Sequence, residues 1–246
     1  MKEGNQRIAI AIILAFGFVV GLVWASSNFK ESRRQAKEIT VTGNAEKNIS
    51  SDVVVWNAYF GLKGQKNLQE AYKKLAEQTN IVRDFFRSKG IADSTVTFES
   101  ISLDDERDSK RVDGEWVSFS TGFSLTQSVR IFSSDIDLVE KLSREVSELI
   151  DKGLYINSSS PQYYYSKLEE SKHELLEMAS RDALSRAKAI ATGSNQSVGK
   201  LLRSQMGVFQ IVGYYENEDY SWGGNFNTTS REKTISVTVK STYAVH

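Results

Sequence analysis

Alternating apolar and polar residues predict several β-strands in the first half of the chain. The predicted strands cover residues 39–49, 52–62, 95–103 and 116–132. In 52–62, the face expected to be buried carries Val54, Trp56, Ala58, Phe60 and Leu62. In 116–132, it carries Val117, Phe119, Phe123, Leu125, Val129 and Ile131. Both sets are therefore predicted to lie in a hydrophobic core.

Three further segments repeat apolar residues at the spacing of an α-helix, with a polar opposite side. Their ends carry typical capping residues: Asn67 and Gly90 for the first, Ser134 with Asp137 and Gly153 for the second, and the capping box Ser166 to Glu169 and about Asn195 for the third. The apolar stripes are Leu68, Tyr72, Leu75, Val82 and Phe86; then Ile136, Val139, Leu142, Val146 and Leu149; then Leu168, Leu175, Ala179, Ala183, Ala187 and Ile190. Each helix is expected to cover a sheet with its apolar side.

The order of these elements predicts the fold class. From 52–62 onward the chain runs strand, helix, strand, strand, helix, strand, which is the split β-α-β pattern of ferredoxin-like domains. The last of these strands, near 155–165, contains Pro161, so we expect an edge position or a bulge there. Two long strands at 199–216 and 230–245 complete an antiparallel hairpin. The prediction is an α+β fold: a ferredoxin-like split β-α-β core with extra antiparallel strands and a long third helix.

One N-terminal transmembrane helix is predicted to precede this fold, because residues 8–24 carry no charge and are long enough to span a bilayer with little to spare. The anchor residues are Ile8, Ile12, Leu14, Phe16, Gly17, Gly21 and Trp24. We divide the chain into an anchor at 1–25, a charged stalk at 26–38 and one domain at 39–246. Cleavage of a signal peptide after Ala25 is the alternative. Basic residues usually stay on the cytoplasmic side of a membrane, so those of the stalk favour a C-terminal domain in the cytoplasm. Long domains can nevertheless cross the membrane against this charge preference, so an outside location stays open.

The composition argues against several classes of function. Outside the first 38 residues the chain has 25 basic and 28 acidic residues, and this net charge argues against a nucleic-acid partner. Without cysteine there is no disulfide, thiolate metal site or cysteine nucleophile. His173 has no nucleophile motif beside it and is expected on a solvated helix face, and His246 is terminal. The acidic run at 104–115 lacks the calcium-loop spacing and is interpreted as a solvated hairpin tip. We therefore expect no enzyme activity, cofactor or metal.

Three stretches are similar to a known family: ITVTGNAEKNISSDVVVWNAYF at 39–60, ASRDALSRAKAIATGSNQSVGKLL at 179–202 and ISVTVKSTYAV at 235–245. They resemble the SIMPL domain family of bacterial envelope proteins, of the periplasmic immunogenic or oxidative-stress-defence type. The resemblance implies an exported α+β domain and, for some members, assembly into rings or channels, with links to envelope and oxidative stress. The loop at 213–229 departs from the family, whose members often have a connection rich in proline and alanine there.

The loop at 213–229 and one strand face are the candidate interfaces. Aromatic side chains are enriched in interface cores, and the candidates are Tyr214, Tyr215, Tyr220, Trp222 and Phe226 in the loop, with Trp116 on a strand face shared with Ser118, Ser120, Ser124 and Ser128. The loop could instead fold back over its own domain. We expect a non-enzymatic, self-assembling ring or cage, held at the cytoplasmic (inner) membrane with its domain in the periplasm. The alternative is a binding module that captures a peptide, lipid or small molecule through the loop or the lumen of an oligomer.

Overall fold

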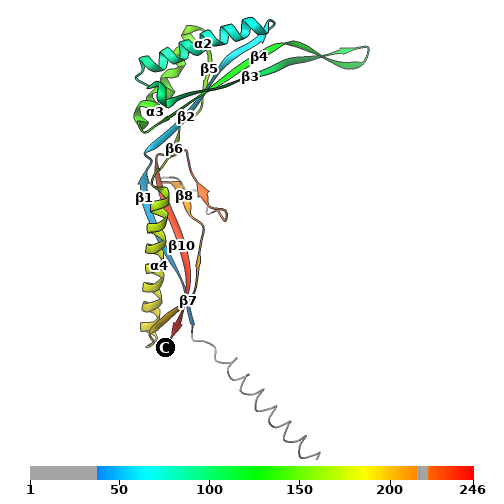
Figure 1. Ribbon diagram of the computed structural model, residues 1–246. Coiled ribbons are helices and arrows are strands. Elements are labelled where there is room, and N and C mark those ends of the chain that lie inside the picture. The colour runs from blue at the N-terminus through cyan, green and yellow to red at the C-terminus, as the bar shows by residue number, and fades with distance from the viewer. Residues whose placement is uncertain (1–37, 215, 217–220) are drawn as a thin grey trace, which may run out of the picture. The chain divides into compact units, whose positions relative to one another are not determined.

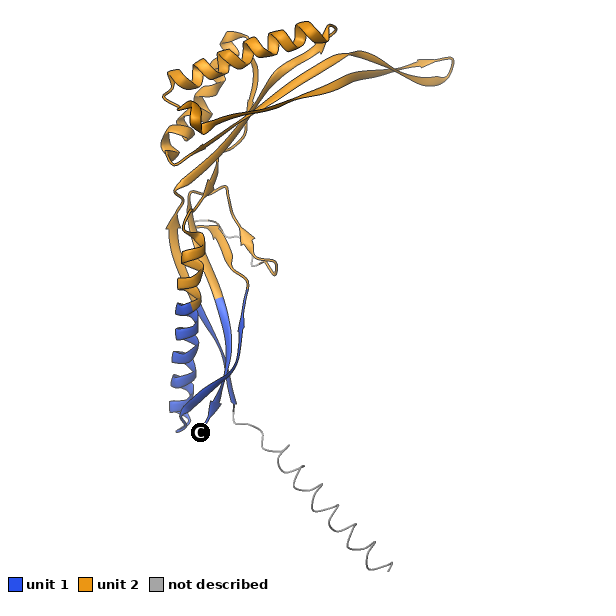
Figure 2. Cartoon of the chain, viewed as in Figure 1, with its two compact units in different colours: residues 1–44, 177–207, 238–246 blue, residues 45–176, 208–237 orange. Residues whose placement is uncertain are grey.

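The computed structural model describes residues 38–214, 216 and 221–246. The predicted anchor and nearly all of the stalk, with Tyr215 and Tyr220, lie outside these residues. Within the described part of the chain, no helix combines the length and apolar character needed to cross a bilayer. The chain divides into two compact units, one of residues 1–44, 177–207 and 238–246, of which 38–44 are described, and one of residues 45–176 and 208–237 (Figure 2).

The larger unit contains the predicted α+β core (Figure 1). Its elements are β2 (Val53–Gln65), α2 (Leu68–Ser88), the 3-10 turn Asp93–Thr95, β3 (Val96–Val112), β4 (Glu115–Ser133), α3 (Ile136–Glu145), the 3-10 segment Val146–Lys152, β5 (Tyr155–Ser158) and β6 (Gln162–Tyr164). The sheet has the order β3-β4-β2-β5, and β6 also pairs with β2. Every pairing in it is antiparallel. The predicted strand near 155–165 is thus two short strands on one edge of β2, separated at Pro161.

Helices α2 and α3 cover one face of this sheet and enclose its core (Figure 1). The alternation in β2 is confirmed, because Val54, Trp56, Ala58 and Phe60 are buried. Trp56 meets Phe86 of α2 edge to face, with 6.0 Å between ring centres. Asn67 caps α2 as predicted, since its side chain accepts from the amide nitrogens of Gln69 and Glu70 at 3.1 and 3.3 Å.

Two helix predictions in this unit need correction. Tyr72 is 39% exposed, because the buried side of α2 passes through its neighbour Ala71 and through Phe85. Asp135, not Ser134, caps α3, with its carboxylate accepting from the Leu138 amide at 3.0 Å. Both errors are one-residue shifts of a correctly predicted helix.

A β-bulge in β4 corrects the predicted face of that strand. Glu106 is paired with Gly122 and Arg107 with Ser120, so Thr121 is an extra residue on β4. An extra residue moves every later side chain to the opposite face. Val117 and Phe119 are therefore out of phase with the buried Leu125, and both are exposed. For the same reason Trp116, Ser118 and Ser120 do not share a face with Ser124 and Ser128.

The remaining elements are β1 (Glu38–Ser50), α4 (Leu168–Gly193), β7 (Val198–Met206), β8 (Gln210–Gly213), β9 (Asn225–Phe226) and β10 (Glu232–Val245). The five strands among them form a second sheet with the order β1-β10-β8-β9, in which β7 also pairs with β10. The predicted hairpin of 199–216 with 230–245 is confirmed, but its first strand is interrupted between β7 and β8. The buried side of α4 has a small residue every fourth position, at Ala179, Ala183, Ala187 and Ala191. Ile190 was assigned to this stripe and is 53% exposed instead.

Candidate functional site

The far part of the β3–β4 hairpin is the most exposed feature of the larger unit (Figure 1). The last pair that β2 makes with β4 joins Gln65 to Phe123, so residues 106–122 pair only with each other. We call residues 106–122 the hairpin arm. Its two strands turn at Asp113 and Gly114, whose φ angles of 51° and 92° fit a tight two-residue turn. Both edges of the arm are thus without a strand partner within the described residues.

Apolar side chains are exposed on both faces of the hairpin arm. Trp116 is 74% exposed on one face, whereas Val117 and Phe119 are 45% and 38% exposed on the other. Polar contacts order the arm along its length: Arg107 Nε donates to Ser118 Oγ at 3.2 Å, and the Lys110 ammonium lies 5.5 Å from the centre of the Phe119 ring. The hairpin predicted at 104–115 is confirmed, and its strands continue to the Asp-Gly turn, which is a sequence signal for such a connection.

The loop at 213–229 has exposed aromatic residues, but its C-terminal end, around Phe226 and Asn227, folds onto its own unit. Tyr214, Trp222 and Phe226 are 46%, 89% and 58% exposed. The Phe226 ring lies 6.4 Å from the Tyr164 ring, and the Asn227 amide donates to Glu216 at 2.9 Å. These contacts favour the interpretation that part of the loop covers its own domain.

Among the described residues, neither histidine belongs to a cluster of potential metal ligands. His173 is exposed on α4, as predicted, and His246 pairs through its backbone with Ser197 at the end of β10. The acidic residues of 104–115 are distributed along the strands of the hairpin and its turn. One of them, Asp105, accepts a hydrogen bond from Ser120 at 2.5 Å.

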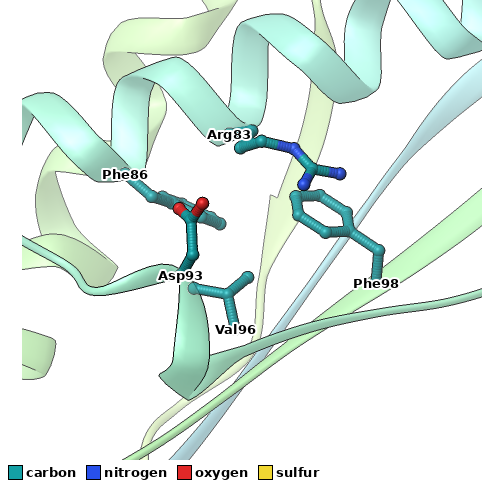
Figure 3. Close-up of a pocket in the computed structure, with 5 residues that line it drawn as sticks. All are labelled: Arg83, Phe86, Asp93, Val96 and Phe98. Carbon is teal, nitrogen blue, oxygen red and sulfur yellow. The ribbon is translucent and has the colours of Figure 1, made fainter.

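Several hollows occur among the described residues of the larger unit. A polar one of about 220 Å³ is lined by Ser88, Lys89, Leu138, Lys141, Leu142 and Glu145, and both of its lysines pair with Glu145. Two others lie elsewhere on the unit. One is formed by Arg83, Phe86, Asp93, Val96 and Phe98 and has a volume of about 30 Å³, enough for one water molecule (Figure 3). Asp93 pairs with Arg87 at 2.5 Å, and the Arg83 guanidinium stacks 4.9 Å from the centre of the Phe98 ring, although the buried Arg83 Nε has no hydrogen-bond partner among the described residues. This hollow has no room for a ligand.

The second hollow measures about 230 Å³ and lies on the sheet around Gly61. Its lining includes Tyr59, Lys63, Thr126, Tyr155 and Asn157, none of which was singled out in the sequence. Glycine inside a predicted strand is the signal that was missed, because it often marks a close approach of another group to the backbone.

One buried cation stands out electrostatically. Lys233 is 2% exposed, and its ammonium donates to Ser51 Oγ at 2.8 Å and to the Tyr163 carbonyl at 2.7 Å. Burial lowers the pKa of Lys233 to about 8. Nearby, burial and a hydrogen bond to Glu140 raise the pKa of the Tyr163 phenol to about 12. The two hydrogen bonds of the ammonium link β10 to the residue that follows β1 and to β6.

Comparison with known proteins identifies the family. Residues 39–243 match the SIMPL family, which is described as a protein of unknown function (DUF541). No curated protein matches the chain.

Proposed function

Because the chain belongs to the SIMPL family, we propose that it is a non-enzymatic envelope protein whose domain assembles into a homo-oligomeric ring or cage through the hairpin arm. The observation that carries this proposal is the arm itself: a two-stranded ribbon with both edges free among the described residues and with apolar side chains exposed on both faces. An isolated two-stranded ribbon is only marginally stable in water. A free strand edge is also a template for pairing with another chain.

The charges of the arm favour a second copy of the chain as its partner. Residues 106–122 contain three cations, Arg107, Lys110 and Arg111, and four carboxylates, Glu106, Asp108, Asp113 and Glu115. A surface with both signs interspersed can complement itself when two copies meet, whereas a strongly acidic or basic arm would repel its copy. The exposed Trp116 is the residue type that most often dominates interface energy.

We further propose that the apolar run at 8–24 anchors each subunit in the cytoplasmic membrane, with the domain in the periplasm. One oligomer would insert several such helices into the same bilayer. Their combined binding would compensate for the short span of each helix. A role in envelope or oxidative stress is what the family resemblance implies. Protease digestion of intact cells and of spheroplasts tests the location: cleavage of the domain only in spheroplasts is expected, and protection in both would contradict it.

Native mass measurement of the full-length protein in detergent tests the assembly. We expect a closed oligomer at micromolar concentration, and we expect Trp116→Asp combined with Phe119→Asp to shift the protein to smaller species. Phe132→Asp is the matched control, because Phe132 is 59% exposed on the same strand outside the arm. A wild-type protein that is monomeric throughout, or an arm variant that assembles like the control, would overturn the proposal.

A further inference from the structure

The hollow around Gly61 has the composition of a small binding site, and it is separate from the hairpin arm. Gly61 lies in β2, opposite Thr126 on one neighbouring strand and Tyr155 on the other. Side chains two residues apart on a strand share a face, so Tyr59 and Lys63 flank Gly61 along β2. Four side chains therefore surround a position that has none, and all four line the hollow.

The glycine is required by the backbone as well. A Cβ built on Gly61 would lie 2.1 Å from the Leu125 carbonyl oxygen, a distance that no side chain tolerates. Glycine at this position therefore allows β4 to approach β2 this closely. It also leaves the bottom of the hollow without a side chain.

Aromatic and polar groups together form the walls. Tyr59 is 43% exposed and Tyr155 is 67% exposed, so both rings are accessible from solvent. Within the described part of the chain, the side chains of Thr126 and Asn157 form no hydrogen bond, although both line the hollow. The walls thus offer two aromatic rings, one hydroxyl and one amide to a ligand.

Lys63 adds a positive charge at one side of the hollow. Its ammonium lies 5.4 Å from the centre of the Tyr155 ring, and it makes no ion pair with any residue that the structure describes. A ligand carboxylate placed beside the ring would pair with this ammonium.

We propose that this hollow binds a single acidic pyranose unit, such as a hexuronic acid residue of a polysaccharide. The C–H bonds of a pyranose ring carry small positive charges that suit the negative face of a tyrosine ring. The hydroxyl groups of a pyranose can donate to and accept from Thr126 and Asn157. Its carboxylate meets Lys63, which gives the hollow a preference for an acidic sugar over a neutral one.

The size of the hollow sets the limits of this site. At about 230 Å³ it holds the volume of roughly eight water molecules, which suits one sugar ring and excludes a folded peptide segment. Open walls and few contacts predict weak binding for one unit, with a dissociation constant of about 1 mM. An oligomer with one hollow per subunit would bind a polymer of such units more tightly through multivalency.

Ligand-observed saturation-transfer NMR on the full-length protein, in a detergent without sugar groups, tests the proposal. The probes are glucuronate, glucose and acetate. Glucuronate is expected to bind, with transfer to its ring protons, and glucose to bind about threefold more weakly. Acetate should bind least, because it lacks the ring. Binding of acetate as tight as that of glucuronate, or no glucuronate binding at roughly 30 mM, would overturn the proposal.

Variants then assign the binding to the hollow. Tyr155→Ala is expected to weaken glucuronate binding about fivefold. Lys63→Gln should remove the preference for glucuronate over glucose and leave glucose binding unchanged. Tyr72→Ala and Lys66→Gln are matched controls at exposed positions outside the hollow, and neither should change either affinity. Equal losses in the variants and their controls would show that the sugar binds elsewhere, and this result would leave the assembly proposal untouched.

Discussion

Gly43 of β1 approaches Ala183 of α4 so closely that a Cβ on Gly43 would lie 2.4 Å from the Ala183 backbone nitrogen. The same Cβ would lie 2.1 Å from the Ala179 carbonyl oxygen. Both neighbours are helix backbone atoms, which cannot rotate away as the end of a side chain can. Helix α4 therefore rests directly on the strand, and the alanines on its buried side make this distance possible.

Gly43→Ala is expected to force β1 and α4 apart and to lower the free energy of unfolding by about 2–3 kcal/mol. Urea denaturation followed by far-UV circular dichroism measures the change. Gly193→Ala is the control, because a Cβ on this last residue of α4 meets nothing within 4 Å. The control should be neutral or slightly stabilising, since alanine favours a helix over glycine. Equal effects of the two substitutions would contradict the close approach.

Trp56→Phe tests the centre of the larger core. Trp56 is fully buried, and its indole nitrogen donates to Ser158 Oγ at 3.1 Å and to the Ser159 carbonyl at 3.0 Å. The substitution leaves a cavity and removes both hydrogen bonds, so the free energy of unfolding should fall by about 2–3 kcal/mol. Trp116→Phe makes the same chemical change at a 74% exposed position and, in a dilute, dissociated sample, should stay within about 0.5 kcal/mol of wild type.

The lowered pKa of Lys233 predicts how the free energy of unfolding changes with pH. Its pKa is lowered to about 8 in the folded protein and is 10.5 for an ordinary lysine, so the unfolded chain binds the proton more tightly. Stability contributed by this group therefore rises as the pH increases from about 8 to about 10.5. Lys233→Met keeps the apolar stem and cannot titrate. The difference in unfolding free energy between wild type and variant should shift in favour of wild type across this pH range.

The comparison of the two proteins at each pH cancels the titration of other groups, such as the tyrosines. Chemical denaturation at pH 7.5, 8.5 and 9.5 is sufficient to measure the trend. Parallel pH profiles for wild type and Lys233→Met would show that burial does not perturb Lys233.

Much of the larger unit could be predicted from the sequence because its pattern is local. The alternation in β2, the Asn67 cap and the order of strands and helices depend on near neighbours along the chain, and all were predicted. Tyr72 and Ile190 were wrongly assigned to the buried side of their helices. Each lies next to a buried alanine, and a large apolar residue outweighs alanine in a sequence pattern. Burial follows the geometry of the helix face and not the size of the residue.

The features that could not be predicted depend on pairing between distant residues. The extra residue at Thr121 changes the face of every side chain beyond it, and only the register with β3 reveals it. Val117 and Phe119 therefore resemble core residues in the sequence although they are exposed in the arm. The Gly61 hollow likewise requires three adjacent strands to be in register before its walls meet.

Hydrogen exchange provides a test of the arm that needs no substitution. In a dilute, dissociated sample, the amides of residues 106–122 should exchange faster than those of residues 125–131 in β4. The arm has solvent on both faces, whereas helices cover residues 125–131. When the protein is concentrated to form the oligomer, exchange in the arm should slow markedly, while exchange in the covered segment changes little. Mass spectrometry of peptides from the two segments measures both rates in one sample. Arm amides that exchange at the same rate at every concentration would mean that the arm remains uncovered in the oligomer.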